Sequence, residues 1–225
     1  MRPKASVFPG CVLVMLLVGT VSAQTPAPTV VRWQYGASNS DLLVRNGLET
    51  VMLGQDNLAV NITLTVVRVS PSRQVVLQDA LVEVINRTDQ RVELVPSRIT
   101  LDLVEPELKL FPYLDPDKLA SNLRRMSHED LMSDNANIEF AEDKTSWASD
   151  IERSAFRENT LLPNESISGH VFFAPPEHYA EDYGKGKLRI VLSVPVGDHL
   201  FKFPFWWDGN LVGGYGFPLW WKAKK

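Results

Sequence analysis

Ser166, Ser168 and His170 stand close enough together in the sequence to suggest a serine nucleophile with a histidine base. Such a serine usually sits in a strained turn that exposes its hydroxyl, as in the Gly-x-Ser-x-Gly motif. The chain has no such motif. Alternation along a strand would place all three side chains on one face. The pattern therefore favours a solvated strand face over a nucleophilic site.

A metal site needs clustered histidine, cysteine or carboxylate ligands. The four histidines, none of them at His-x-His or His-x-x-x-His spacing, are His128, His170, His178 and His199. His178 and His199 each follow an acidic residue, and they could meet if their loops fall at one end of the fold. Loop histidines on the surface are more common, so we predict no metal, no cofactor and no catalytic residue.

Paired carboxylates are harder to judge, because a glycosidase draws its two acids from distant strands. The chain has 27 acidic residues, so chance alone will bring some pairs together. One alternative is therefore an enzyme that acts on cell-wall material or a polysaccharide. It would use acids such as Glu129, Asp130 and Asp143, facing a cleft.

The C-terminal segment 206–225 is rich in aromatic residues, and its FPLWWKAKK partly repeats the preceding FPFWWDGN. Turn-forming residues lie between the two halves, so the halves could fold as a hairpin. Adjacent tryptophans in a strand face opposite ways, so one of each pair could be exposed. The candidate binding residues are Trp206, Trp207, Tyr215, Trp220 and Trp221.

Three interpretations of this segment stay open. The aromatic residues could close one end of the core, which is their more common use. They could instead form a surface for sugar rings, a peptide or a partner protein. In the third interpretation the tryptophans and Lys222, Lys224 and Lys225 make a peripheral contact with anionic lipid headgroups.

The N-terminus has the layout of a cleaved secretory signal over residues 1–23. Arg2 and Lys4 precede an apolar run, CVLVMLLV, and Val21-Ser22-Ala23 supplies small residues before the cleavage point. Residues 24–30 are predicted to be a spacer. Cleavage would remove the one cysteine, and it would change the net charge from −4 to −6 by removing those two basic residues. We therefore expect a periplasmic or secreted protein with no nucleic-acid partner and no later transmembrane segment.

The mature chain alternates apolar and polar residues in the manner of strands. We predict strands over 58–66, 74–85, 91–104, 169–174, 187–196 and 199–205, with a two-residue turn at Gly197-Asp198. Between them, 115–158 changes to helical spacing, beginning with Asp115 as a helix cap before Pro116. The sequence thus indicates one domain over 31–205, mainly β, with a helical insertion at 115–158.

Two stretches carry a resemblance to a known class. Val82–Leu101, VEVINRTDQRVELVPSRITL, has a strand, an Asn-x-Thr turn and a second strand, and Leu161–Phe173 reads LLPNESISGHVFF. Together they resemble bacterial extracytoplasmic immunoglobulin-like domains of unknown function, over roughly 58–205 without the insertion. The resemblance implies a Greek-key, immunoglobulin-like β-sandwich that serves as an accessory or binding module. It transfers no functional residue.

These observations lead to one functional hypothesis with two alternatives. The hypothesis is a secreted or periplasmic, non-enzymatic binding or accessory protein. Its aromatic surface would contact a protein or glycan of the cell envelope. The alternatives are the cell-wall or polysaccharide-acting enzyme described above and a structural subunit of an envelope assembly, docking by an exposed sheet edge.

Overall fold

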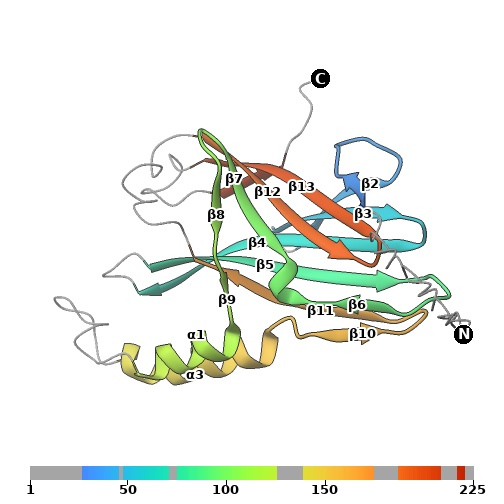
Figure 1. Cartoon of the computed structure of the whole chain (residues 1–225). Helices are drawn as coiled ribbons and strands as arrows, with labels where there is room; N and C mark the ends of the chain where they lie inside the picture. Colours follow the sequence, from blue (N-terminus) through green and yellow to red (C-terminus); the bar gives the residue numbers. More distant parts are fainter. Residues whose placement is uncertain are drawn as a thin grey trace, which may run out of the picture.

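The computed structural model describes residues 27–45, 48–70, 75–125, 139–174, 187–208 and 217–220. The predicted signal peptide lies outside these residues. Most of the described chain is strand, and two six-stranded sheets form two layers (Figure 1). The mainly β class predicted from the alternating pattern is therefore confirmed.

The first layer, which we call the β13 sheet, has the strand order β1-β13-β12-β7-β8, with β14 also paired to β13. Its strands are β1 (Thr29–Arg32), β7 (Thr100–Glu105), β8 (Lys109–Phe111), β12 (Lys187–Val196), β13 (His199–Asp208) and β14 (Phe217–Trp220). One edge of β13 is shared: β1 pairs in parallel with its beginning, and β14 pairs antiparallel with its end. Two residues of the predicted spacer, Thr29 and Val30, thus belong to β1.

The second layer, the β4 sheet, has the order β2-β3-β4-β5-β11-β9. Its strands are β2 (Ser40–Arg45), β3 (Leu48–Gln55), β4 (Leu58–Ser70), β5 (Val75–Asn86), β9 (Tyr113–Leu114) and β11 (Ser166–Phe173). A separate two-stranded ribbon joins β6 (Val92–Leu94) to β10 (Asn159–Leu161), and a short 3-10 helix, η1 (Pro96–Arg98), precedes β7.

The core lies between the layers, because alternate residues of both sheets point inward. Val60 and Ile62 of β4 and Val82 and Val84 of β5 are fully buried, as the period-two pattern predicts. The other sheet contributes inward residues of β7, β12 and β13, which belong to the same apolar cluster: Leu101, Leu103, Leu188, Ile190, Leu192, Val194, Phe201, Phe203 and Phe205. The predicted turn is also present, since Gly197 has φ +56°, a conformation that favours glycine.

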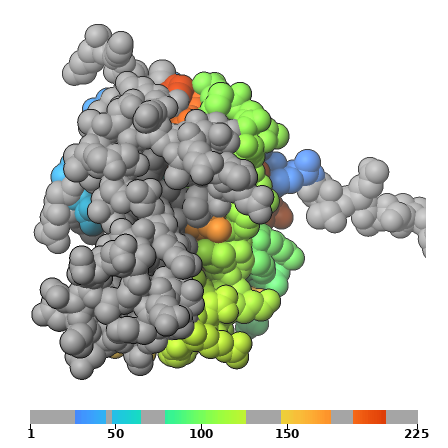
Figure 2. All heavy atoms as spheres, turned by 90° about the vertical axis from the view of Figure 1, so that its left-hand side faces the viewer, coloured from blue at the N-terminus to red at the C-terminus, as the bar shows by residue number. Residues whose placement is uncertain are grey.

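One side of the two layers is closed by the chain itself. After pairing with β7 as β8, the chain passes through Pro112 and pairs with β11 as β9, so it crosses from one sheet to the other. Phe111, at the crossing, is fully buried. Figure 2 shows the molecule from the left-hand side of Figure 1. In this view, green to yellow-green atoms run from the β7–β8 turn down to the first helix.

Two helices lie within 115–158, the segment predicted from sequence to be a helical insertion. They are α1 (Pro116–Arg125) and α3 (Glu139–Ser154), which pack on each other beside β11 (Figure 1). Two exposed bidentate pairs reinforce this arrangement: Arg124 pairs with Glu152 across the helices, and Arg157 pairs with Asp117. Neither helix is long and apolar enough to span a membrane, and the other described residues contain no such helix.

The Asp115 cap predicted from sequence is confirmed. Its Oδ1 accepts hydrogen bonds from the backbone N–H groups of Asp117 and Lys118, each at 3.0 Å. Loss of a cap of this kind costs about 0.5–2 kcal/mol. We therefore expect Asp115→Ala to lower the free energy of unfolding by about 1 kcal/mol in urea titration. Asp115→Ser, which keeps an acceptor, should recover most of this loss, and equal losses in both variants would contradict the assignment.

Candidate functional site

The outer face of the β13 sheet carries apolar, aromatic and positively charged side chains. The pairing registers place Val30 beside Leu200 and Arg32 beside Lys202 on this face. Farther along, Trp206 lies opposite Arg189 and Pro204 lies opposite Val191. The face therefore combines apolar and aromatic side chains with three cations.

The two cations Arg32 and Lys202 are register partners on adjacent strands. Like charges directly opposite each other destabilise a sheet. Arg189 differs from them, because its Nη1 donates to Oε1 of Glu105 at 2.9 Å. The Arg32–Lys202 pair therefore places two positive charges side by side on the part of the sheet that leads to Trp206. Two carboxylates, Asp102 and Glu105, line the same depression, and Glu105 is paired with Arg189.

A groove of about 390 Å³ lies beside Trp206. Its walls come from β1 and the residues after it, from β12 and from β13: Arg32, Trp33, Gln34, Arg189, Pro204, Phe205 and Trp206. An adjoining depression of about 370 Å³ shares Arg32, Arg189 and Pro204 and extends over Lys202 and Asp102. The two hollows thus form one path across the sheet, which we call the sheet-face groove.

The groove has a rigid base. Trp33 is 2% exposed, its backbone N–H donates to the carbonyl of Lys202 at 2.8 Å, and its indole Nε1 donates to the carbonyl of Asp41 at 3.2 Å. These bonds connect the end of β1 to both sheets. Trp206 itself is partly buried, with one part of its surface available to the groove.

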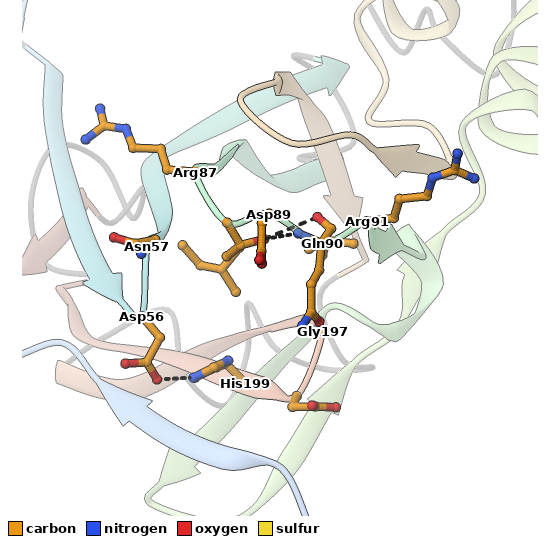
Figure 3. Close-up of a pocket in the computed structure, with 12 residues that line it drawn as sticks. Asp56, Asn57, Arg87, Asp89, Gln90, Arg91, Gly197 and His199 are labelled. Atoms are coloured by element: carbon orange, nitrogen blue, oxygen red, sulfur yellow. Dashed lines mark hydrogen bonds and ion pairs between the residues drawn. The ribbon is translucent and has the colours of Figure 1, made fainter.

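A larger, more polar hollow of about 640 Å³ lies at one end of the layers (Figure 3). Three connections form it: the β3–β4 turn at Asp56-Asn57, residues 87–91, and the β12–β13 turn. His199 Nε2 and Asp56 Oδ2 are 2.9 Å apart, and this hydrogen bond lowers the pKa of the Asp56 carboxyl. Arg87 and Arg91 point away from the centre in Figure 3, so the hollow presents no convergent set of charges.

The predicted aromatic site residues fall into three groups. Trp206 lines the sheet-face groove. Trp207 and Trp220 lie in paired strands, where Trp207 is opposite Pro218 and Trp220 is opposite Phe205. Tyr215 and Trp221, together with Lys222, Lys224 and Lys225, lie outside the described residues. The structure thus folds β14 back on β13, and of the five predicted residues it places Trp206 at a hollow.

The serine, histidine and acidic residues that the sequence offered as catalytic or metal-binding candidates do not form one site among the described residues. Ser166 and Ser168 are exposed, as predicted, whereas His170 is partly covered, with 30% of its side chain exposed, and its Nδ1 lies 2.8 Å from Asp79. Glu129, Asp130, His128 and His178 lie outside the described residues, and the side chain of Asp143 is also not described. Among the described residues, no group of three metal-ligating side chains occurs.

Sequence reasoning missed the cations of the sheet-face groove. Arg32, Arg189 and Lys202 come from three strands, and nothing in their local sequences marks them. Alternation could have placed Lys202 on the face of Trp206, because both are even-numbered positions of the same strand. The parallel pairing of β1 with β13, which adds Arg32, has no local signal.

No protein-family model matches the sequence, and no curated protein does so either. Among solved structures, the chain is similar to a putative lipoprotein (ycdA) from Bacillus subtilis, with a TM-score of 0.37 and 13% sequence identity. The match covers 71% of this chain and 38% of that protein.

Proposed function

We propose that this chain is a secreted or periplasmic, non-enzymatic binding protein that holds an acidic glycan of the cell envelope in the sheet-face groove. The observation that carries the proposal is the placement of Trp206 in a groove that also contains the adjacent cations Arg32 and Lys202, while Arg189 is paired with Glu105. A tryptophan face stacks on sugar rings, and the Arg32–Lys202 pair attracts carboxylate or sulfate groups. The immunoglobulin-like type of sandwich belongs to the same proposal, since such modules serve mostly in binding.

Trp206→Ala should test the aromatic contact directly. If Trp206 is a central contact, its truncation should weaken binding by about 1–3 kcal/mol, or about 5- to 150-fold. The measurement is isothermal titration calorimetry of the chain from Gln24 onward against acidic oligosaccharides (oligogalacturonate and oligoalginate) and neutral cello-oligosaccharides. We expect affinity for the acidic sugars, decreasing with salt.

The matched control is Leu162→Ala, which truncates another partly exposed apolar side chain, 41% exposed, outside the groove. It should leave the affinity unchanged. Thermal unfolding of both variants establishes that they are folded. Equal binding of acidic and neutral sugars would contradict the role of the cations, and unchanged affinity in a folded Trp206→Ala variant would contradict the site.

A structural subunit remains the second candidate, because one specific feature favours it. β2 is the last strand of the β4 sheet among the described residues, and Val44 on it is 66% exposed. β2 contains neither proline nor lysine, the residues that commonly protect an edge. If partner proteins from an envelope extract bind Trp206→Ala normally but are lost with Val44→Pro, the β2 edge is the functional surface.

A further inference from the structure

A third hollow, independent of the sheet-face groove, lies between the helices and the outer face of the β4 sheet. Its volume is about 190 Å³. Most of the wall surface is apolar and comes from Leu123, Trp147, Ile151 and Phe172. The polar side chains that line the pocket are Asp79, Asp150, Ser154 and His170. We call it the helix–sheet pocket.

The pocket is built where the helices cover β5 and β11. Inward residues of β11, such as Val171 and Phe173, belong to the main core, whereas Phe172 on the outer face packs in a second cluster with Leu123 and Ile151. The backbone after α3 is fixed on the sheet, because the N–H of Phe156 donates to the carbonyl of His170 at 2.9 Å. The pocket walls are therefore held by the helices and by the β4 sheet.

A buried aspartate paired with a half-buried histidine stands at the base of this pocket. The Asp79 side chain is 4% exposed, and the Nδ1 atom of His170 lies 2.8 Å from both of its carboxylate oxygens. This hydrogen bond raises the pKa of the His170 imidazole, although partial burial acts in the opposite direction. The His170 ring also stacks on Phe172, with centroids 6.1 Å apart. The pair thus fixes the orientation and the tautomer of the ring, with the proton on Nδ1.

Stability alone does not explain this pair. Replacing a buried ion pair with apolar residues of similar volume is often neutral or stabilising. Here the pair stands beside unfilled space in an otherwise apolar layer. With Nδ1 bound to Asp79, the ring has Nε2 left for another group, and within the described part of the chain Nε2 has no hydrogen-bond partner.

We propose that the helix–sheet pocket binds a small uncharged molecule in which a ring carries a hydroxyl group, such as a phenol. A cavity of about 150 Å³ can hold a benzene ring, so the volume fits one ring. A hydroxyl both donates and accepts, so it can bond to Nε2 whether the imidazole is neutral or charged.

Charged ligands fit the pocket less well. A carboxylate would lie close to Asp79 and Asp150, whereas an ammonium group would approach His170 in its charged form. The two carboxylates already have partners, since Asp79 pairs with His170 and Asp150 pairs with Arg153. A neutral ring with one hydroxyl avoids both conflicts and buries its apolar part against Leu123, Ile151 and Phe172.

The test is a titration of the chain from Gln24 onward with phenol, in which binding is monitored by NMR. We expect saturable binding that shifts the ¹⁵N resonance of His170 Nε2 and the indole resonance of Trp147. Phenol should bind at least tenfold more tightly than benzene, and more tightly than benzoate or benzylamine. Absence of saturable phenol binding, or tighter binding of benzoate or benzylamine, would overturn the proposal.

A pair of variants locates the site. Ser154→Leu places a larger side chain at the pocket wall at the end of α3 and should reduce phenol affinity at least tenfold. Ser149→Leu makes the same change at an exposed position of α3 outside the pocket and should leave affinity unchanged. If Ser154→Leu folds and binds phenol as the natural chain does, the pocket is not the site. If Ser154→Leu does not fold, the ¹⁵N resonance of His170 Nε2 in the natural chain locates the site: a shift with phenol supports the pocket, and no shift overturns it.

Discussion

Gly169→Ala is expected to lower the free energy of unfolding by at least about 3 kcal/mol. A Cβ atom at this position of β11 would lie 2.5 Å from Cα of Phe156 and 2.6 Å from its backbone nitrogen. Real Cβ atoms do not approach backbone so closely, so the chain after α3 would have to move. Phe156 is 2% exposed in the core, and its N–H is bonded to His170, so the movement would disturb both contacts.

Thermal unfolding measures this effect, and a loss of that size lowers Tm by about 6–12 °C in a chain of this length. Gly54→Ala is the matched control. Gly54 also lies in a strand, but its Cβ would meet only the carbonyl oxygen of Leu58, at 3.6 Å, an ordinary contact. We expect it to change stability by less than about 1 kcal/mol. If Gly169→Ala unfolds at the same temperature as the natural chain, the close approach of Phe156 is wrong.

Asn86→Ala is expected to cost about 3–4 kcal/mol, because one fully buried side chain bonds to four backbone groups. Asn86 is fully buried at the end of β5. Its Nδ2 donates to the carbonyl oxygens of Gln90 and Leu162, at 2.8 and 3.1 Å, and more weakly to that of Leu161. Its Oδ1 accepts from the backbone N–H of Thr88 at 3.0 Å. Alanine would remove all of these bonds, although the carbonyls of Gln90 and Leu162 would keep the Thr88 hydroxyl and the Glu165 N–H as donors.

Urea unfolding gives the free-energy change, and Asn39→Ala is the control. The Asn39 side chain makes two exposed bonds: its Nδ2 donates to the carbonyl of Gly54 at 3.2 Å, and its Oδ1 accepts from the Ser40 hydroxyl at 3.5 Å. Because both bonds are exposed to water, their loss should cost less than about 0.5 kcal/mol. Asn86→Ala should also loosen residues 87–91, which form one wall of the large hollow in Figure 3, and faster hydrogen exchange at Thr88 would report this. Equal stabilities of the two variants would refute the role of Asn86.

The strands with clear alternation could be predicted, because their pattern is a local consequence of having one buried face. Residues 187–196 form a strand with the predicted limits, and Phe201, Phe203 and Phe205 share the buried face as expected. β2 and β3 were not predicted. The Leu42-Leu43-Val44 run in β2 has no period of two, and the apolar residues of β3 are mixed with Gly54 and short polar stretches.

The candidate sites were less predictable, because each hollow joins residues that are distant in the sequence. Alternation places His170 on the outer face of its strand, but only the tertiary structure shows that α3 covers this face. The pairing of His170 with Asp79 depends on the register between β5 and β11, which sets Phe172 directly opposite Asp79. Likewise, Trp206 is visible in the sequence as an aromatic residue, whereas its cationic neighbour Arg32 arrives through the pairing of β1.

The shared edge of β13 also constrains the order in which the molecule can be completed. β1 is the first described strand, yet its register partners are His199 to Lys202, near the other end of the chain. During synthesis β1 therefore has no partner until almost the whole chain has been made. Contacts between such distant segments slow folding, because a large loop must close before they form. Any fragment that ends before β13 lacks this partner, so β1 stays unpaired in such a fragment.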